Sequence, residues 1–497
     1  MPFFQPSEYQ IGRGEVAESR FEVPFIAGFM LFCGIGLFIF QVFVGDEYLT
    51  LALAATLLIF GVTMFRVELG VYILVIGMLL SPEVETGSVG FGHRELNIRY
   101  NDFLIMVVFM GVLVKQVYEK RAYLWLPSPV NIAIVLYFTV CLISTALAYD
   151  RNLPLFDEQT AAFTLLKMLQ YYMLFALVGL AIRNRTQIKR LLATFFVTAV
   201  ISSLYGIYAR FALFDRVSAP FEKGGTEPNT FGGYLVLVMC IALSLMIHAP
   251  TRKLRMLFLA IALAAFSPFL FTLSRASYIA FLAALIVIGL VNRKYSFVVL
   301  VGLICLVYPY VMPEDVVNRV NYTFQQGYGV EVEVAGQSTG LQVDKSTHER
   351  IYVWQKVWYN LHVWPWLGGG VTWDRVMDSQ YARVFIETGI VGFIAFLFLQ
   401  LKLFQTARES YLWTSDWLYK GLGVGVFVIT AALIVQSLGT ISFLIIRIME
   451  PYWFLFALAC VARHNCLTEY YEYKQAQLRA TREAALNIVA PTPAHAR

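Results

Sequence analysis

One long apolar segment restricts what this chain can fold into. The 37 residues from Met256 to Asn292 contain a single charged residue, Arg275. As one straight α-helix the segment would be about 55 Å long, whereas the hydrocarbon core of a bilayer is roughly 30 Å thick. We therefore predict that it folds as a hairpin of two membrane-spanning helices, with "LSRAS" (Leu273–Ser277) as the turn.

The composition extends this interpretation to the whole chain. Of its 497 residues, 59% are hydrophobic and 14% are charged, whereas soluble domains carry about 25% charged residues. We predict an all-α polytopic membrane protein with about fourteen transmembrane helices. Their expected positions are near 25–44, 49–65, 67–80, 103–116, 130–148, 160–182, 190–208, 230–248, 256–273, 276–292, 296–312, 384–401, 421–438 and 443–462. The expected divisions are a leader at 1–24, helices 1–11 at 25–312, a large loop at 313–383, helices 12–14 at 384–462 and a tail at 463–497.

The basic residues predict how the helices are oriented. With the N-terminus in the cytoplasm, 23 of the 38 Lys and Arg residues fall in cytoplasmic segments, which are mostly short, and 13 fall outside. Short cytoplasmic loops concentrate Lys and Arg, so we expect both termini in the cytoplasm and the Arg275 turn and the large loop on the outer face. Within the spans, we expect Lys167 to extend toward the membrane surface and Arg447 to pair with Glu450 on one helix face.

The large loop contains a segment with a helical pattern. In "HERIYVWQKVWYNLHVWPWLGGG", the apolar residues Ile351, Trp354, Trp358 and Leu361 recur at helical spacing, and Trp favours the membrane interface. We predict a helix on the outer membrane surface that ends at Pro365. The Gly-rich first half of the loop, "QQGYGVEVEVAGQSTGLQVDKST", is predicted to form either a mobile flap or a short hairpin.

Several basic residues are expected on the outer face. Arg216 and Lys223 lie in one outer segment, Arg275 in the hairpin turn and Arg350 in the large loop. Because arginine forms paired hydrogen bonds with phosphate oxygens, the pattern favours a phosphate-bearing ligand. The alternative for Arg275 is a hairpin cap that contacts lipid headgroups. The sequence contains no GxxxxGK phosphate loop and no HExxH, CxxC or DxD motif, so we expect no nucleotide site, no metal and no other cofactor.

Four segments, in this order, resemble the family of O-antigen ligases and Wzy-type polysaccharide polymerases. They are "RVSAPFEKGGTEPNTFGGYL" from Arg216, "FTLSRASYIAF" around Arg275, "HERIYVWQKVWYNLHVWPWLGGG" from His348 and "DSQYARVFIETGIVGFIAF" from Asp378. The resemblance is strongest between about Arg183 and Phe396. It implies a GT-C-like glycosyltransferase of the bacterial inner membrane. Such an enzyme would act on undecaprenyl-pyrophosphate-linked glycans at the periplasmic face, without a nucleotide sugar or a metal.

The resemblance also implies roles for individual residues. Arg216 and Arg275 would bind the pyrophosphate of the donor. The further candidates for substrate binding are Arg350, Lys223, Tyr381 and Trp354. The aromatic side chains among them would stack on sugar rings, and the alternative is that they anchor the protein at the membrane interface.

The acceptor hydroxyl requires a base within hydrogen-bond reach. Ligases of this family characteristically have a His before the final "ETG" segment, whereas "MDSQYARVFIETG" here contains Asp378 and no His. This departure favours a polymerase over a ligase. It makes Asp378 and His348 the candidate catalytic bases, with Glu387 as a third choice.

We therefore predict a polymerase of lipid-linked repeat units that works by a single inverting displacement. The alternatives are a ligase of the same family and a transporter or flippase, which would show internal repeats and broken helices. The expected partners are the undecaprenyl-pyrophosphate-linked oligosaccharide as donor and acceptor, the lipid bilayer, a chain-length regulator and a flippase, with no nucleic acid. The sugars, their linkage and the kind of polymer, whether O-antigen, capsule or exopolysaccharide, stay open.

Overall fold

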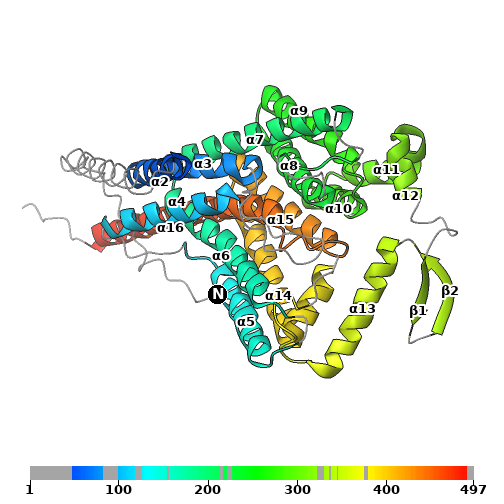
Figure 1. Ribbon diagram of the computed structural model, residues 1–497. Helices are drawn as coiled ribbons and strands as arrows, with labels where there is room; N and C mark the ends of the chain where they lie inside the picture. Colours follow the sequence, from blue (N-terminus) through cyan, green and yellow to red (C-terminus); the bar gives the residue numbers. More distant parts are fainter. Residues whose placement is uncertain are drawn as a thin grey trace, which may run out of the picture.

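The structure is a computed structural model that describes residues 47–81, 99–118, 126–153, 156–212, 216–220, 227–321, 330–334, 337–343, 345–373 and 379–489. Within these ranges it contains fifteen helices and one two-stranded hairpin (Figure 1). The helices before the large loop are α2 (Glu47–Phe65), α3 (Val67–Leu80), α4 (Tyr100–Tyr118), α5 (Val130–Asp150), α6 (Glu158–Ala181), α7 (Arg185–Ala212), α8 (Pro228–His248), α9 (Arg252–Phe271), α10 (Arg275–Val291) and α11 (Ser296–Val311). The remaining elements are α12 (Glu314–Asn321), β1 (Val330–Val334), β2 (Gln337–Val343), α13 (Lys345–Val363), α14 (Gln380–Leu412), α15 (Trp417–Gln436) and α16 (Ile446–Val489).

The described helices form a multi-pass membrane protein. Eight of them are long and apolar enough to cross a bilayer, or up to nine if α11 and α12, which meet at 112°, form one broken span. Every predicted span from 49–65 onward overlaps a helix, and the run near 25–44 lies outside the described residues. With 14 and 17 residues, α3 and α10 are only about 21 and 26 Å long at about 1.5 Å per residue. The total of fourteen spans therefore stays a prediction.

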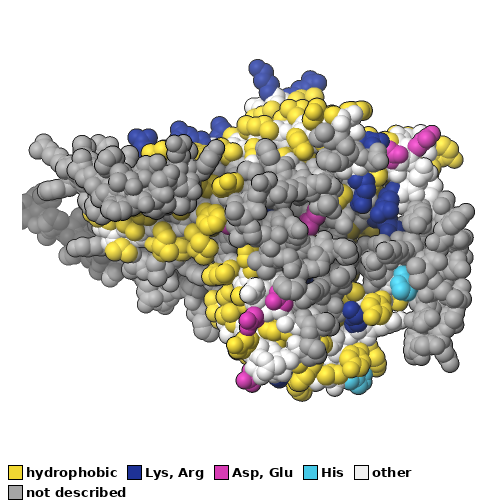
Figure 2. Space-filling model, viewed as in Figure 1, with side chains coloured by type: hydrophobic (Ala, Val, Ile, Leu, Met, Phe, Trp, Pro, Cys, Tyr) yellow, Lys and Arg dark blue, Asp and Glu magenta, His cyan; other side chains and the backbone are white. Residues whose placement is uncertain are grey.

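The outer faces of the helices carry large apolar side chains, which Figure 2 shows as yellow areas. Ile132, Leu204, Leu263 and Leu303 are each more than half exposed. Soluble proteins rarely expose apolar patches of this extent, so these faces fit contact with lipid.

Helix α8 lies in the middle of one half of the bundle, where it contacts α9, α10, α15 and α16 (Figure 1). All of its residues from Thr230 to Ala242 are buried. A small residue near its beginning permits this packing. A Cβ atom on Gly233 would lie 2.9 Å from Nε2 of Gln436 in α15, closer than carbon and nitrogen atoms pack without a shift.

The predicted hairpin around Arg275 is confirmed. Helix α9 ends at Phe271, and α10 begins at Arg275. Between them Leu273 has a φ of 52°, a left-handed conformation that non-glycine residues rarely adopt. Ser274 caps α10, because its Oγ accepts the backbone N–H of Ser277 at 3.4 Å. We refer to Phe271–Arg275 as the α9–α10 turn.

Helix α14 is interrupted at Gly389, which has φ 64° and ψ −162°. The segment Pro365–Gly370 fills this break. The backbone N–H groups of Gly369 and Gly370 donate to the carbonyls of Ile386 and Glu387, and the N–H groups of Ile390 and Val391 donate to Pro365 and Trp366. Since backbone groups inside a bilayer need partners within the protein, these four bonds make the interruption tolerable.

The large loop contains more regular structure than its sequence suggested. Strands β1 and β2 pair in an antiparallel way, which resolves the alternative between flap and hairpin and corrects the expectation of an all-α chain. The predicted loop helix is confirmed as α13, whereas its position on the membrane surface stays a prediction. Val353 and Val357 are buried against α14, whereas Trp354 and Trp358 are exposed. The β-branched residues face the protein because two of them, four apart, fit against Ala382 and Ile386.

Candidate functional site

The segment Arg216–Pro220 lies directly beside the α9–α10 turn. The backbone N–H of Val217 donates to the Phe271 carbonyl at 3.0 Å, and Nη2 of Arg216 donates to the Thr272 carbonyl at 3.4 Å. Val217, like the two residues that follow it, is buried. The fold therefore brings Arg216 next to the turn that carries Arg275, although 58 residues of chain separate them.

A third arginine, which the sequence reasoning did not single out, lies at the same turn. Nε of Arg319 in α12 donates to the carbonyl of Leu273 at 3.4 Å. An ion pair between Asp315 of α12 and Arg210 of α7, with 2.5 Å between Oδ2 and Nη2, holds the short helix against the bundle, and Val316 is buried. Figure 2 shows Lys and Arg side chains gathered beside α10 and α12.

The positive charges of Arg319 and Arg275 act on the guanidinium group of Arg216. Partial burial lowers the pKa of Arg216 below its ordinary value, and the positive charges of Arg319 and Arg275 lower it further. Among the residues that the structure describes, Arg216 has no ion-pair partner, and its buried Nε has no hydrogen-bond acceptor. The first residue of α10 is Arg275, so the partial positive charge of the helix N-terminus adds to the field at the turn. An anion bound here would offset the repulsion between these positive charges.

Polar contacts with α15 hold the beginning of α10 in place. Nε2 of Gln436 in α15 donates to Oγ of Ser277 at 3.0 Å, and Ser277 Oγ lies 2.9 Å from Ser274 Oγ. At the same end of α15, the backbone N–H of Gln380 donates to the Ser437 carbonyl at 3.0 Å. The beginnings of α10 and α14 thus meet at the end of α15.

A buried arginine anchors the segment that carries Arg216. Arg447 in α16 is 1% exposed, and its Nη1 donates to the carbonyl of Pro220 at 2.8 Å. Sequence reasoning expected Arg447 to pair with Glu450, and this expectation was wrong. Glu450 instead accepts from Asn101 at 2.7 Å and from Gln170 at 2.8 Å. The two residues lie on one helix but bind elements on different sides of it.

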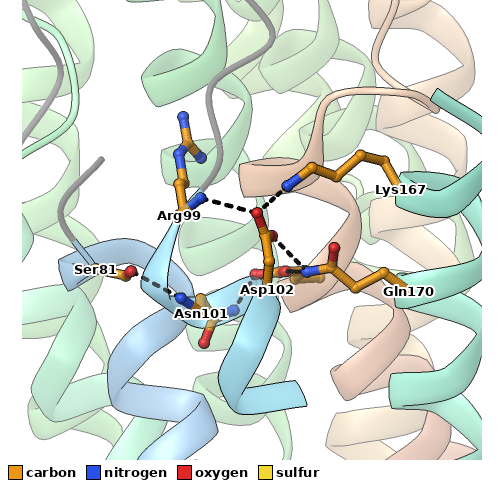
Figure 3. Close-up of polar contacts among 7 residues, drawn as sticks. Ser81, Arg99, Asn101, Asp102, Lys167 and Gln170 are labelled. Carbon is orange, nitrogen blue, oxygen red and sulfur yellow. Dashed lines mark hydrogen bonds and ion pairs between the residues drawn. The ribbon is translucent and has the colours of Figure 1, made fainter. Parts of the chain in front are cut away.

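Glu450 belongs to a buried polar network between α4, α6 and α16. Nε2 of Gln170 donates to Asp102 Oδ1 and to Glu450 Oε1, each at 2.8 Å, and Lys167 forms an ion pair with Asp102 (Figure 3). The expectation that Lys167 extends to the membrane surface was therefore wrong, since the residue is 6% exposed. A lysine that can pair with a carboxylate inside the bundle does not need to reach the headgroups.

The structure places the other candidate residues as follows. Asp378, Lys223 and the side chain of Arg350 lie outside the described part. His348 is half-buried in the first turn of α13, and Trp354 is exposed on the same helix. The hydroxyl of Tyr381 donates to the Ile434 carbonyl at 2.8 Å, so this group is already engaged within the protein.

Glu387, the third candidate base, is held in a structural position. Its carboxylate pairs with Arg383 at 2.7 Å and accepts the backbone N–H of Thr372 at 2.8 Å. Both contacts lie at the break in α14, and the residue is 7% exposed. Among the described residues, no group of three or more His, Cys, Asp and Glu side chains has a geometry suited to a metal ion.

The apolar helices define a multi-pass membrane protein, and three arginines cluster at its α9–α10 turn. Residues 264–397, from within α9 to within α14, match the family model described as O-antigen ligase. This match supports the resemblance over residues 264–397, about a quarter of the chain. The matched segment includes the α9–α10 turn, Arg319 and the break at Gly389. A comparison with curated proteins gave no match.

Proposed function

We propose that this protein polymerises lipid-linked polysaccharide repeat units in the bacterial inner membrane. It transfers the growing glycan from undecaprenyl pyrophosphate to the non-reducing end of an incoming lipid-linked repeat unit. The reaction takes place at the periplasmic face, and both termini lie in the cytoplasm. The observation that carries the proposal is the position of Arg216 beside Arg275 at the α9–α10 turn.

The chemistry of glycosyl transfer explains why guanidinium groups are needed. As the bond between the anomeric carbon and the pyrophosphate oxygen breaks, negative charge builds on the leaving group. Guanidinium groups that are already in place stabilise this charge, because they need not reorganise during the step. Arg216 bonds to the α9–α10 turn, and Arg275 is the first residue of α10. Together they supply the positive charge that a metal ion supplies in other enzymes.

The transfer is a single displacement with inversion. The acceptor hydroxyl oxygen bonds to the anomeric carbon, the pyrophosphate departs with the bonding electrons, and the hydroxyl proton passes to a base. Asp378 and His348 are the proposed bases. Glu387 is the weaker choice, because its carboxylate is occupied by Arg383 and the Thr372 N–H. Trp354 and Tyr381 are proposed to contact sugars, and Arg350 and Lys223 to extend the basic surface.

Two observations bear on the alternatives. The family match is compatible with both a ligase and a polymerase, whereas the absence of His from "MDSQYARVFIETG" favours a polymerase. The interrupted α14 resembles the broken helices of transporters, but its free backbone groups bond to Pro365–Gly370 rather than pointing toward a substrate cavity. We therefore place the polymerase first and the ligase second.

A reconstitution assay tests the proposal. Purified protein in proteoliposomes is given one undecaprenyl-pyrophosphate-linked repeat unit, and the products are separated on a gel. We expect a ladder of added repeats from the wild-type protein and none from the folded Arg275→Ala variant. A single transfer that needs a second acceptor would identify a ligase instead, and movement of the lipid-linked sugar between leaflets without new glycosidic bonds would reject both enzyme functions.

A further inference from the structure

Arg319 occupies a place in the site that suits contact with a ligand. It comes from α12, which lies after the bent connection at the end of α11. Its Nε donates to the Leu273 carbonyl, while Arg216 donates to the adjacent Thr272 carbonyl. The two guanidinium groups are therefore positioned on consecutive residues of one turn, and Arg275 follows two residues later.

The three arginines lie near one another at a cost, since like charges repel. The charge of Arg319 affects Arg216 more strongly than that of Arg275 does, so Arg319 is part of the same electrostatic site. It is also half-buried rather than extended into solvent. A residue that merely fastened α12 could be any hydrogen-bond donor, because the bond that it makes is to a backbone carbonyl.

The ligand's charge gives a reason for a third guanidinium. A diphosphate that links a lipid to a sugar has two phosphate groups, each with one negative charge. When the sugar leaves, the terminal phosphate gains up to one further charge near neutral pH, since its second pKa is about 6. One arginine can form paired hydrogen bonds with one phosphate, so two phosphates and a developing third charge match three arginines better than two.

We propose that Arg319 contacts the diphosphate together with Arg216 and Arg275 and makes the site selective for a lipid diphosphate over a lipid monophosphate. This inference rests on the proposed function of the same site. It assigns α12 to the donor site and explains why a short helix at the beginning of the large loop is docked against the α9–α10 turn.

Lipid binding by matched variants tests this inference. The protein in nanodiscs is titrated with undecaprenyl pyrophosphate and, separately, with undecaprenyl phosphate. The variants are Arg319→Gln, Arg319→Lys and Arg216→Gln. The control is Arg255→Gln, because Arg255 also donates through Nε to a backbone carbonyl, that of Ala249 at 2.8 Å, at the beginning of α9 and thus at the opposite end of that helix.

We expect Arg319→Gln to weaken diphosphate binding by about 10- to 100-fold, the loss of one charge-assisted hydrogen bond, and monophosphate binding by less than about 3-fold, since the two remaining arginines suffice for one phosphate. Arg319→Lys should recover part of the diphosphate affinity, and Arg255→Gln should change neither. The ratio of the diphosphate and monophosphate affinities, measured on variants that fold fully, separates a binding role of Arg319 from a fastening role. Fastening alone would not alter this ratio.

Three results would overturn the inference in distinguishable ways. If Arg319→Gln binds both lipids as the wild type does while Arg216→Gln loses diphosphate binding, Arg319 has no ligand role and the proposed function stands. If Arg319→Gln weakens both lipids equally, Arg319 contributes general attraction without selectivity. If neither the wild type nor any variant binds undecaprenyl pyrophosphate, the proposed function fails together with this inference.

Discussion

The break in α14 makes a sharp prediction about Gly389. Its φ of 64° and ψ of −162° lie in a region that is open essentially to glycine alone. A Cβ atom at this position would lie 2.5 Å from both the carbonyl carbon and the carbonyl oxygen of Trp366. Both atoms belong to the backbone, so a change of side-chain rotamer cannot relieve the contact. Gly389→Ala must therefore move Pro365–Gly370 away from α14.

The size of the effect follows from what such a movement disrupts. Adopting the unfavourable backbone conformation costs about 1–3 kcal/mol. Four backbone hydrogen bonds join the segment to α14, and the loss of two of them costs about 1–3 kcal/mol more at 0.5–1.5 kcal/mol each. We expect Gly389→Ala to lower the free energy of unfolding by about 4 kcal/mol, which is exceptional for a single substitution.

Gly302 in α11 provides a matched control, because a Cβ atom there would meet nothing within 4 Å. Gly302→Ala should leave the protein unchanged or stabilise it by up to about 1 kcal/mol, the difference in helix propensity. Unfolding of both variants by SDS in mixed micelles measures the free energies. Equal stability of Gly389→Ala and Gly302→Ala would refute the reasoning, since it would mean that the segment does not depend on a glycine at the break.

Three further substitutions test other contacts. Lys167→Met should destabilise the protein by about 3 kcal/mol in the same unfolding assay, because it leaves the Asp102 carboxylate buried without its ion-pair partner. The addition of Asp102→Asn should recover most of this loss. Additive losses of stability in the double variant would contradict the prediction. Arg447→Gln should raise the KM for the lipid-linked donor about 10-fold with a smaller change in kcat, because the segment that carries Arg216 loses its hydrogen bond at Pro220. An unchanged KM in steady-state kinetics would argue against this role of Arg447. Glu387→Gln should reduce the stability of the protein while retaining at least about a tenth of the transfer rate. Loss of a general base typically lowers the rate 100-fold or more. A rate loss of that size with unchanged stability would identify Glu387 as the base.

The elements that sequence reasoning predicted are those determined by local pattern. Apolar length required a hairpin around Arg275, and the structure has its turn at Phe271–Arg275. The spacing of Ile351 to Leu361 indicated a helix, which is present as α13. Its packed face was not predictable, because the face depends on Ala382 and Ile386 of α14, which lie beyond the loop in the chain.

Contacts between distant residues account for what the sequence did not reveal. Lys167 was expected at the surface because its partner, Asp102, lies 65 residues away on another helix. Arg319 lies 46 residues from Leu273, and the valines on one face of its short helix, Val316, Val317 and Val320, do not indicate which turn that helix packs against. The interruption of α14 depends on the Pro365–Gly370 segment, and a helix pattern in the sequence continues through "ETGIVGF" without a sign of it.

The proposed function requires that the arginines at the α9–α10 turn stabilise a departing pyrophosphate. The most direct measurement is the initial rate at which undecaprenyl pyrophosphate is released, per glycosidic bond formed, from a purified lipid-linked repeat unit. For the wild type and the Arg255→Gln control we predict one molecule released per bond. For Arg216→Gln we predict the same ratio at a rate lower by at least about 100-fold, as for removal of a transition-state charge stabiliser. Release by Arg216→Gln at the wild-type rate, or bond formation without release of the pyrophosphate, would contradict the account.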